Sequence, residues 1–197
     1  MSTDLPWNSR GLLSPISTPT GMNRSPYKIS LVQLIERFAT PPERRLIVNG
    51  FLAYRRELHK IGLADGFQWI DGSFVEDIEA LETRPPGDID VITFYAIPAG
   101  ETQAKLFNKN PVLFPSNEDE KEALKKIFPV DGSLTSLDVT PRKLIKQTVF
   151  WYSLWAHRRD QTWKGFLEIE LGGLDDAAAQ SLLDSFHDMK TEMQDED

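Results

Sequence analysis

The sequence predicts an α+β domain in which helices flank a small mixed β-sheet of three to five strands. Apolar residues recur at helical spacing in segments near both ends of the chain. Short runs rich in β-branched and aromatic residues lie between these segments and indicate strands. The chain has 197 residues, 40% of them hydrophobic, which is enough for one full core. It contains no cysteine, so disulfides and thiolate metal sites are excluded.

Residues 1–27 differ in composition from the rest of the chain. They contain four prolines, several serines and threonines, and no periodic apolar pattern. We therefore expect an extended or disordered arm that is loosely tethered. The alternative is that its apolar residues pack on the body or on a partner, which could be another protein or a second copy of the chain: Trp7, Leu12, Leu13 and Ile16. Residues 28–197 are expected to form a single domain.

Two helices are predicted before the first central strand. The first covers residues 30–39 with Ser30 as its N-cap, and the second runs from about 41 to 61 with Pro42 in its first turn. Four arginines of the second helix are expected mostly on its solvated face, and the alternative is that they bind substrate phosphate: Arg44, Arg45, Arg55 and Arg56.

Residues 66–95 carry the main chemical signal of the sequence. The apolar run 67–70 predicts a strand that ends in a turn at Gly72-Ser73. A short helix is expected over 74–81, and the Pro-Pro-Gly sequence after it precedes a second predicted strand, 88–95.

Asp88 and Asp90 would share one face of that second strand, because side chains alternate along a strand. Two neighbouring carboxylates repel each other, and a divalent cation with oxygen ligands relieves the repulsion. A Gly-Ser turn at the start of a helix offers free backbone N–H groups and a hydroxyl to a phosphate. The alternative is that Asp88 is a turn residue after Pro-Pro-Gly and Asp90 lies on a solvated strand face.

The combination of Gly72-Ser73 with Asp88-Ile89-Asp90 resembles the signature of the nucleotidyltransferase superfamily, which has the polymerase-β-like fold. The longer stretches 71–75 and 86–91 are most similar to uncharacterised bacterial nucleotidyltransferase-like proteins, some of them linked to toxin–antitoxin or phage-defence systems. The resemblance implies Mg²⁺ or Mn²⁺ on the aspartates and a nucleoside triphosphate whose phosphates lie on the Gly-Ser turn. It also implies a nucleotidyltransferase-like core, here with N-terminal helices and a C-terminal acidic helix.

The remaining elements follow from periodicity and capping residues. They are expected as helices over 101–108 and 116–128, a strand over 134–139, a helix over 141–157, a strand over 165–171 and an acidic helix over 175–193.

A two-metal site needs a third carboxylate from another strand. We assign Asp138, because it lies between Leu137 and Val139 in a short predicted strand; the other possibilities are Asp131, Glu168 and Glu170. We expect Asp131 to be a turn residue of an Asp-Gly-Ser sequence. Asp138 could instead cap the following helix.

Charge is unevenly distributed. The net charge is −8, but residues 175–197 alone carry −7, so the rest of the chain is close to neutral and general binding of nucleic acid through overall charge is not expected. Residues 140–165 form a local basic segment of +5 with three interleaved tryptophans. From this segment we assign Arg158 and Lys164 to the triphosphate; the alternative is that the tryptophans belong to the core and the basic residues to a solvated rim.

The resemblance therefore predicts an enzyme that moves a nucleoside monophosphate to an unidentified acceptor, which could be RNA (tRNA included), protein or a small molecule. A catalytically silent protein of the same fold that acts as a regulatory partner is the alternative, and a plain interaction domain is a third possibility. The sequence has neither a signal peptide nor an apolar run long enough to cross a bilayer, so we expect a cytoplasmic protein.

Overall fold

The computed structural model of the protein describes residues 5–18 and 20–194. Over these residues the protein is α+β, with a five-stranded mixed sheet and seven α-helices, which confirms the predicted fold class. The strands are β1 (Tyr27–Lys28), β2 (Gly66–Asp71), β3 (Ile89–Tyr95), β4 (Val130–Ser136) and β5 (Leu167–Glu170). The helices are α1 (Leu31–Phe38), α2 (Pro42–Lys60), α3 (Ile78–Glu82), α4 (Gln103–Lys109), α5 (Glu118–Ile127), α6 (Pro141–Trp155) and α7 (Asp176–Gln194).

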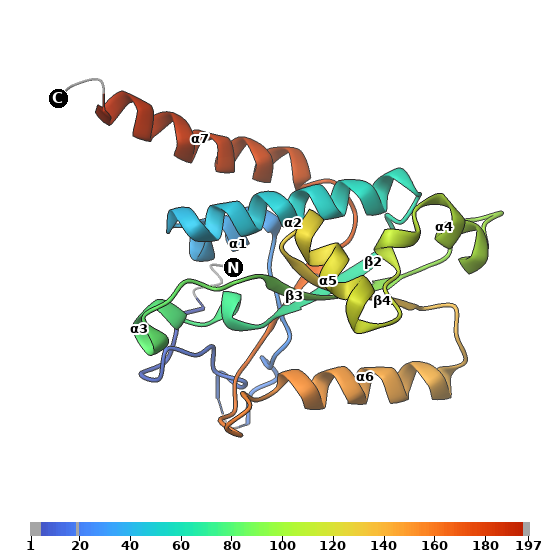
Figure 1. Ribbon diagram of the computed structural model, residues 1–197. Coiled ribbons are helices and arrows are strands. Elements are labelled where there is room, and N and C mark those ends of the chain that lie inside the picture. Colours follow the sequence, from blue (N-terminus) through green and yellow to red (C-terminus); the bar gives the residue numbers. More distant parts are fainter. Residues whose placement is uncertain (1–4, 19, 195–197) are drawn as a thin grey trace.

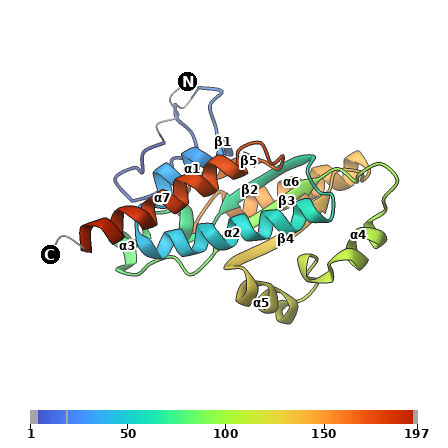
Figure 2. The same ribbon diagram turned by 90° about the horizontal axis from the view of Figure 1, so that it is seen from above.

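The elements form layers around the sheet (Figure 1). Helices α1 and α2 lie on one side of the sheet with α7 outside them, and α6 lies on the other side. Seen from above, the described part of the N-terminal arm is on the β1 side and α4 and α5 are on the β4 side (Figure 2). None of the described helices combines the length and apolar character needed to cross a membrane.

The strand order of the described sheet is β1-β5-β2-β3-β4. Strand β3 pairs with β2 in the antiparallel sense and with β4 in the parallel sense. This arrangement places Asp71, the last residue of β2, opposite Asp90 of β3, and Asp90 opposite Asp131 of β4.

The two faces of the sheet bury different side chains. Ile70 and Val91 point to the α1–α2 side and join a large core with residues such as Phe51 of α2. Trp69 and Phe94 point the other way and pack with Trp155 of α6. Because alternate residues of a strand share a face, Asp71 and Asp90 lie on the α6 side, next to each other at one end of this apolar surface.

Two of the four arginines of α2 are buried, so the expectation of a solvated face is wrong for them. The guanidinium of Arg55 donates to Asp176 of α7 at 2.7 Å and to Gln68 of β2. Arg44 donates to both carboxylate oxygens of Glu79, at 2.6 and 2.7 Å, and to backbone carbonyls of the segment after Gly72-Ser73. Each cation is buried with several acceptors, which is the condition under which a buried charge is tolerated.

The arm folds onto the body over its described residues, so the interpretation of a loosely tethered tail is wrong there. Leu12 and Leu13 are buried. The indole N–H of Trp7 donates to the carbonyl of Val75 at 2.8 Å, and the amide of Asp77 donates to the carbonyl of Gly11 at 2.8 Å. The arm therefore supports the segment that follows the Gly-Ser turn.

Several element boundaries differ from those predicted. Residues 74–81 do not form one helix: a 3₁₀ turn, η1 (Ser73–Val75), is followed by the five-residue α3. Strand β4 begins at Val130, four residues before the predicted strand, and ends at Ser136. Helix α1 matches its prediction, with Ser30 as N-cap in a reciprocal capping box with Gln33.

Candidate functional site

Three aspartates lie side by side at one end of the sheet. Asp71, Asp90 and Asp131 are register partners on the adjacent strands β2, β3 and β4. Residues paired across strands point to the same face, so the three carboxylates converge on the α6 side. Asp88 lies two residues before Asp90 and adds a fourth carboxylate to that side.

The Gly72-Ser73 turn lies directly against this row of aspartates. Gly72 has φ +83°, a conformation that glycine adopts without steric cost. A Cβ atom at position 72 would lie only 1.8 Å from Oδ2 of Asp90, so no other residue fits without displacing that carboxylate. The local reason for glycine is therefore both the positive φ and the close approach of Asp90.

Two lysines neutralise three of the four aspartates. Nζ of Lys125 lies 3.1 Å from Asp88 and 2.9 Å from Asp131, so one ammonium from α5 bridges the two strand ends. Nζ of Lys164 is buried and lies 2.9 Å from Asp71. The same ammonium lies 2.8 Å from Glu76 and donates to the carbonyl of Gly72 at 3.2 Å.

Asp90 is the exception within the row, because it forms neither an ion pair nor a hydrogen bond with any described residue. Burial and then the negative charges of Asp88, Asp71 and Asp131 together raise its pKa to about 7, although the charge of Lys164 opposes this shift. Burial also raises the pKa of Asp71 to about 6, although the charge of Lys164 opposes this shift. A carboxylate held among like charges with no cation of its own favours binding a proton or an external cation.

A cavity of about 750 Å³ opens in front of the aspartates. Asp88, Asp90, Gly72, Ser73, Arg158 and Lys164, all assigned from the sequence, line it, together with Asp71 and Asp131. Within the cavity wall, Arg158 lies 3.3 Å from Glu76 and 2.5 Å from Glu82. Lys164 is buried beneath the turn, where it holds Asp71 and the carbonyl of Gly72.

The placement predicted for Asp138 is wrong. Asp138 lies beyond the far end of β4, and its Oδ2 accepts a hydrogen bond from the backbone N–H of Ile97 at 2.6 Å. Asp90 and Asp131 lie near the beginnings of the parallel strands β3 and β4, so Asp138 is separated from them by the length of the sheet. A cation at Asp88 and Asp90 cannot reach it.

The carboxylate that does face the pair is Asp131, which the sequence pattern presented as a turn residue. It lies inside β4 because that strand starts earlier than predicted. The two glutamates considered as alternatives are engaged elsewhere: Glu168 accepts from the indole N–H of Trp69 at 3.0 Å, and Glu170 pairs with Lys28. Asp71 was not assigned from the sequence, although its position directly before Gly72-Ser73 could have identified it as a residue of the site.

The donor set fits a hard divalent cation by its chemistry, since Asp88, Asp90 and Asp131 offer only carboxylate oxygens. Among the described residues, however, no three His, Cys, Asp or Glu side chains already surround one point. The ammonium of Lys125 instead bridges the carboxylates of Asp88 and Asp131. A cation at this site would have to compete with that lysine.

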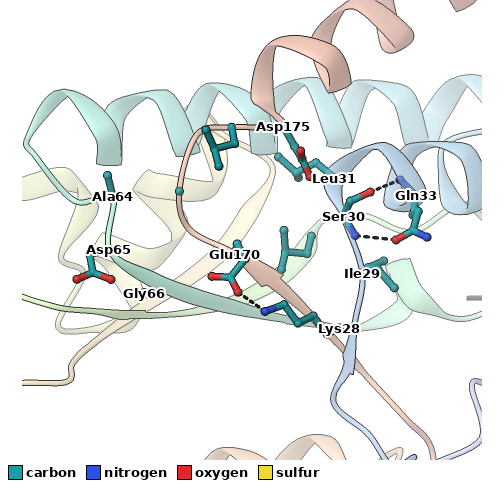
Figure 3. A pocket seen from close by; sticks show the side chains of 13 residues that line it. Lys28, Ile29, Ser30, Leu31, Gln33, Ala64, Asp65, Gly66, Glu170 and Asp175 are labelled. Carbon is teal, nitrogen blue, oxygen red and sulfur yellow. Dashed lines mark hydrogen bonds and ion pairs between the residues drawn. The ribbon is translucent and has the colours of Figure 1, made fainter. Parts of the chain in front are cut away.

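A second cavity, of about 530 Å³, lies at the opposite end of β2 and β5 (Figure 3). Four of its polar side chains bind one another: Lys28 pairs with Glu170, and Ser30 and Gln33 form the reciprocal cap of α1. It lacks a cluster of repelling charges like that at Asp90, so we place the candidate functional site at the row of aspartates.

Fold and site together define an α+β protein with an acidic cavity at the end of a mixed sheet, closed on one side by a Gly-Ser turn. Residues 5–170 match the family described as "Family of unknown function (DUF6932)", and the chain belongs to this family. Neither a curated protein nor a solved structure matches the chain. The function must therefore be argued from the site itself.

Proposed function

We propose that this protein is a metal-dependent nucleotidyltransferase that moves a nucleoside monophosphate from a nucleoside triphosphate to an acceptor hydroxyl or phosphate. The observation that carries the proposal is the juxtaposition of the Gly72-Ser73 turn with Asp90, whose carboxylate has no cation of its own. The resemblance of these residues to the nucleotidyltransferase signature supports the same conclusion. It also supports a nucleotidyltransferase-like core within the α+β fold, although the helix expected after the turn is broken into η1 and α3.

The proposed reaction is a group transfer at the α-phosphorus of the nucleoside triphosphate. An acceptor oxygen forms a bond to the α-phosphorus while the bond from that phosphorus to the oxygen bridging the β-phosphorus breaks, and pyrophosphate leaves. A proton on an acceptor hydroxyl passes to a carboxylate of the row and then to water. No oxidant or reductant is required.

Asp88, Asp90 and Asp131 would hold Mg²⁺ or Mn²⁺. When bound, the cation would neutralise phosphate charge and lower the pKa of the attacking group. Asp131 replaces Asp138 in this assignment because it is the acid on the adjacent strand that is in register with Asp90.

The other cavity residues would bind and orient the nucleotide. Ser73 and the backbone of the turn would contact the outer phosphates. Arg158 extends toward the same cavity from the segment after α6, where it would add positive charge beside the phosphates. Lys164 would act indirectly, because it is buried and fixes the carbonyl of Gly72 and the carboxylate of Asp71.

A second candidate function is a catalytically silent binding protein of the same fold. The observation that favours it is Lys125, whose ammonium already occupies the space between Asp88 and Asp131 where a cation would bind. In such a protein the lysine would replace the metal permanently, and the cavity would bind a nucleotide or a partner without Mg²⁺.

Nucleotide binding with and without Mg²⁺ separates the two candidates. Calorimetry of the wild-type chain with each of the four common ribonucleoside triphosphates should give binding that requires Mg²⁺. The double variant Asp88→Asn/Asp90→Asn should lose the Mg²⁺-dependent binding and keep its fold. Asp138→Asn is the matched control, because it makes the same chemical change at the far end of the sheet and should bind like the wild type.

The outcome that contradicts the enzyme is nucleotide affinity that is the same in the double variant and in the wild type, with and without Mg²⁺. Binding that is independent of Mg²⁺ would support the silent protein instead. Release of pyrophosphate on adding an acceptor is then the direct measurement of transfer.

A further inference from the structure

A groove leads away from the acidic cavity between the edge strand β4 and helix α6. It has a volume of about 400 Å³ and is lined by Ser133 and Thr135 of β4 and by residues of α6. Figure 1 shows α6 running along the side of the sheet opposite α1 and α2. The α6 side of the groove carries two lysines and two aromatic residues: Lys143, Lys146, Phe150 and Trp151.

The groove adjoins the acidic cavity along both walls. On the strand wall, Asp131 lines the cavity and Ser133, two residues on and on the same face, lines the groove. On the helix wall, Trp155 lines the cavity and Trp151, one turn earlier, lines the groove, with 5.3 Å between the ring centroids. A ligand lying in the groove would therefore present one end to the row of aspartates.

The lysines of the groove differ in their surroundings from those of the acidic cavity. Among the described residues neither Lys143 nor Lys146 forms an ion pair, and α6 contains no acidic residue. By contrast, the two lysines of the acidic cavity, Lys125 and Lys164, each bridge two carboxylates. Two solvated ammonium groups beside one groove are complementary to an anionic chain such as a sugar–phosphate backbone.

The aromatic residues of the groove offer a surface for stacking. Phe150 is 57% exposed, and its ring contacts that of Trp151 edge to face, with 5.2 Å between centroids. Exposure of a large apolar ring beside lysines is not explained by core packing, since Trp155 is the buried residue of α6. Single-stranded nucleic acids bind to proteins by this combination of backbone-tracking cations and rings on which bases stack.

Gln147 adds a hydrogen-bonding group to the same groove. Its Oε1 is buried and has no hydrogen-bond partner among the described residues. A buried acceptor without a partner is costly, and the amino group of a base would satisfy it.

We propose that the β4–α6 groove binds a single-stranded nucleic acid whose end reaches the row of aspartates as the acceptor. The role as acceptor rests on the proposed nucleotidyl transfer, whereas the binding itself does not. The groove residues Lys143 and Lys146 contact phosphates, and Phe150 stacks on a base.

The test is fluorescence anisotropy of labelled 12-nucleotide single-stranded RNA and DNA of mixed sequence, measured on the full chain in EDTA without nucleotide. The variant Lys143→Glu/Lys146→Glu should weaken binding at least tenfold at low salt. The slope of log K against log salt should also become shallower by about 1.4, because each phosphate contact on a single strand contributes about 0.7. Phe150→Ala should weaken binding about tenfold, the loss of one stacked base.

The matched control is Lys105→Glu/Lys126→Glu, which makes the same change of charge on exposed lysines outside the groove and should bind like the wild type. All substituted residues are exposed, and circular dichroism checks that each variant folds. Equal losses in the control and groove variants would overturn the proposal, and so would absence of binding to either oligonucleotide. Displacement of the oligonucleotide by polyglutamate at equal charge concentration would also overturn it, in favour of an acidic protein segment.

The experiments distinguish a failure of the groove proposal from a failure of the proposed nucleotidyl transfer. If Asp88→Asn/Asp90→Asn binds the oligonucleotide normally but the wild type binds no triphosphate, the groove stands and the nucleotidyl transfer does not. If triphosphate binding requires Mg²⁺ but the groove variants bind the oligonucleotide like the wild type, the groove is refuted and the transfer stands.

Discussion

Replacing Asp90 with Asn should stabilise the protein at neutral and alkaline pH. Asp90 is largely buried, has no cation of its own, and is surrounded by Asp88, Asp71 and Asp131, which raises its pKa to about 7. In the unfolded chain its pKa returns to about 3.9. The folded protein therefore bears an unfavourable charge at pH 8 that asparagine, with nearly the same shape, removes.

The magnitude follows from the pKa difference. A rise of the pKa from about 3.9 in the unfolded chain to about 7 in the folded protein corresponds to about 4 kcal/mol. The amide of asparagine also needs partners in this position, so we expect the free energy of unfolding to rise by about 2–4 kcal/mol at pH 8.

The pH dependence has a definite sign. Between about pH 4 and pH 7 the folded state holds the Asp90 proton and the unfolded state does not, so the stability of the wild type falls as pH rises through this range. Above pH 7 both states are ionised and the full cost is present; below pH 4 both are protonated and the cost disappears. The advantage of Asp90→Asn should therefore be largest at pH 8 and vanish near pH 4.

The assay is urea denaturation of the wild type, Asp90→Asn and the control Asp138→Asn in EDTA at several pH values. Asp138 is exposed at the other end of the sheet, so its variant should show no such gain. Adding Mg²⁺ at pH 8 should stabilise the wild type and leave Asp90→Asn nearly unchanged. An Asp90→Asn variant that is less stable than the wild type at pH 8, or equally stable at every pH, would refute the reasoning.

Three further variants test neighbouring features. Gly72→Ala should lower the free energy of unfolding by about 2 kcal/mol or more in urea denaturation, because φ is +83° and the new Cβ meets the Asp90 carboxylate; an unchanged stability would contradict this close approach. Lys125→Gln should cost about 1 kcal/mol in EDTA, because its ion pairs are partly exposed, and Mg²⁺ should restore that loss; a loss that Mg²⁺ leaves unchanged favours the silent protein. Arg44→Met should cost about 3 kcal/mol by thermal unfolding, since it leaves Glu79 and two buried carbonyls without their donor; a neutral effect would mean that water replaces the guanidinium.

Most elements could be predicted from the sequence because their signals are local. Apolar residues at helical spacing and the N-cap residue Ser30 predicted α1. The β-branched run after Pro-Pro-Gly predicted β3. The two-residue strand β1 could not be predicted, because its pairing with β5 is decided by residues 140 positions away. The break after Val75 likewise depends on contacts from distant segments: Arg44 and Trp7 bind the carbonyls of residues 74–76.

The site was predicted in part, for a related reason. The sequence identified Gly72, Ser73, Asp88 and Asp90, which are close in the chain. The identity of the third carboxylate depends on the register of β4 against β3. Because the predicted strand began four residues too late, it excluded Asp131, and Asp138 was assigned instead. The Asp-Gly-Ser of residues 131–133 has turn composition, but it lies in a strand because these residues pair with residues 90–92 of β3, and a Cβ atom at Gly132 would lie close to Leu124 and Tyr54.

The arrangement of cations around the aspartates connects the stability of the site to its proposed chemistry. Lys164 is buried and fixed, so its charge is a permanent part of the turn. Lys125 is only partly buried and reaches in from a surface helix, so it can withdraw into solvent without leaving an unpaired buried charge. Asp90 lies near both lysines but forms an ion pair with neither, and its pKa is raised to about 7. A divalent cation that displaced Lys125 would relieve Asp90 and the two released carboxylates together. This is why the same residues that destabilise the metal-free protein would favour a metal, and why the response of stability to Mg²⁺ distinguishes an enzyme from a silent relative.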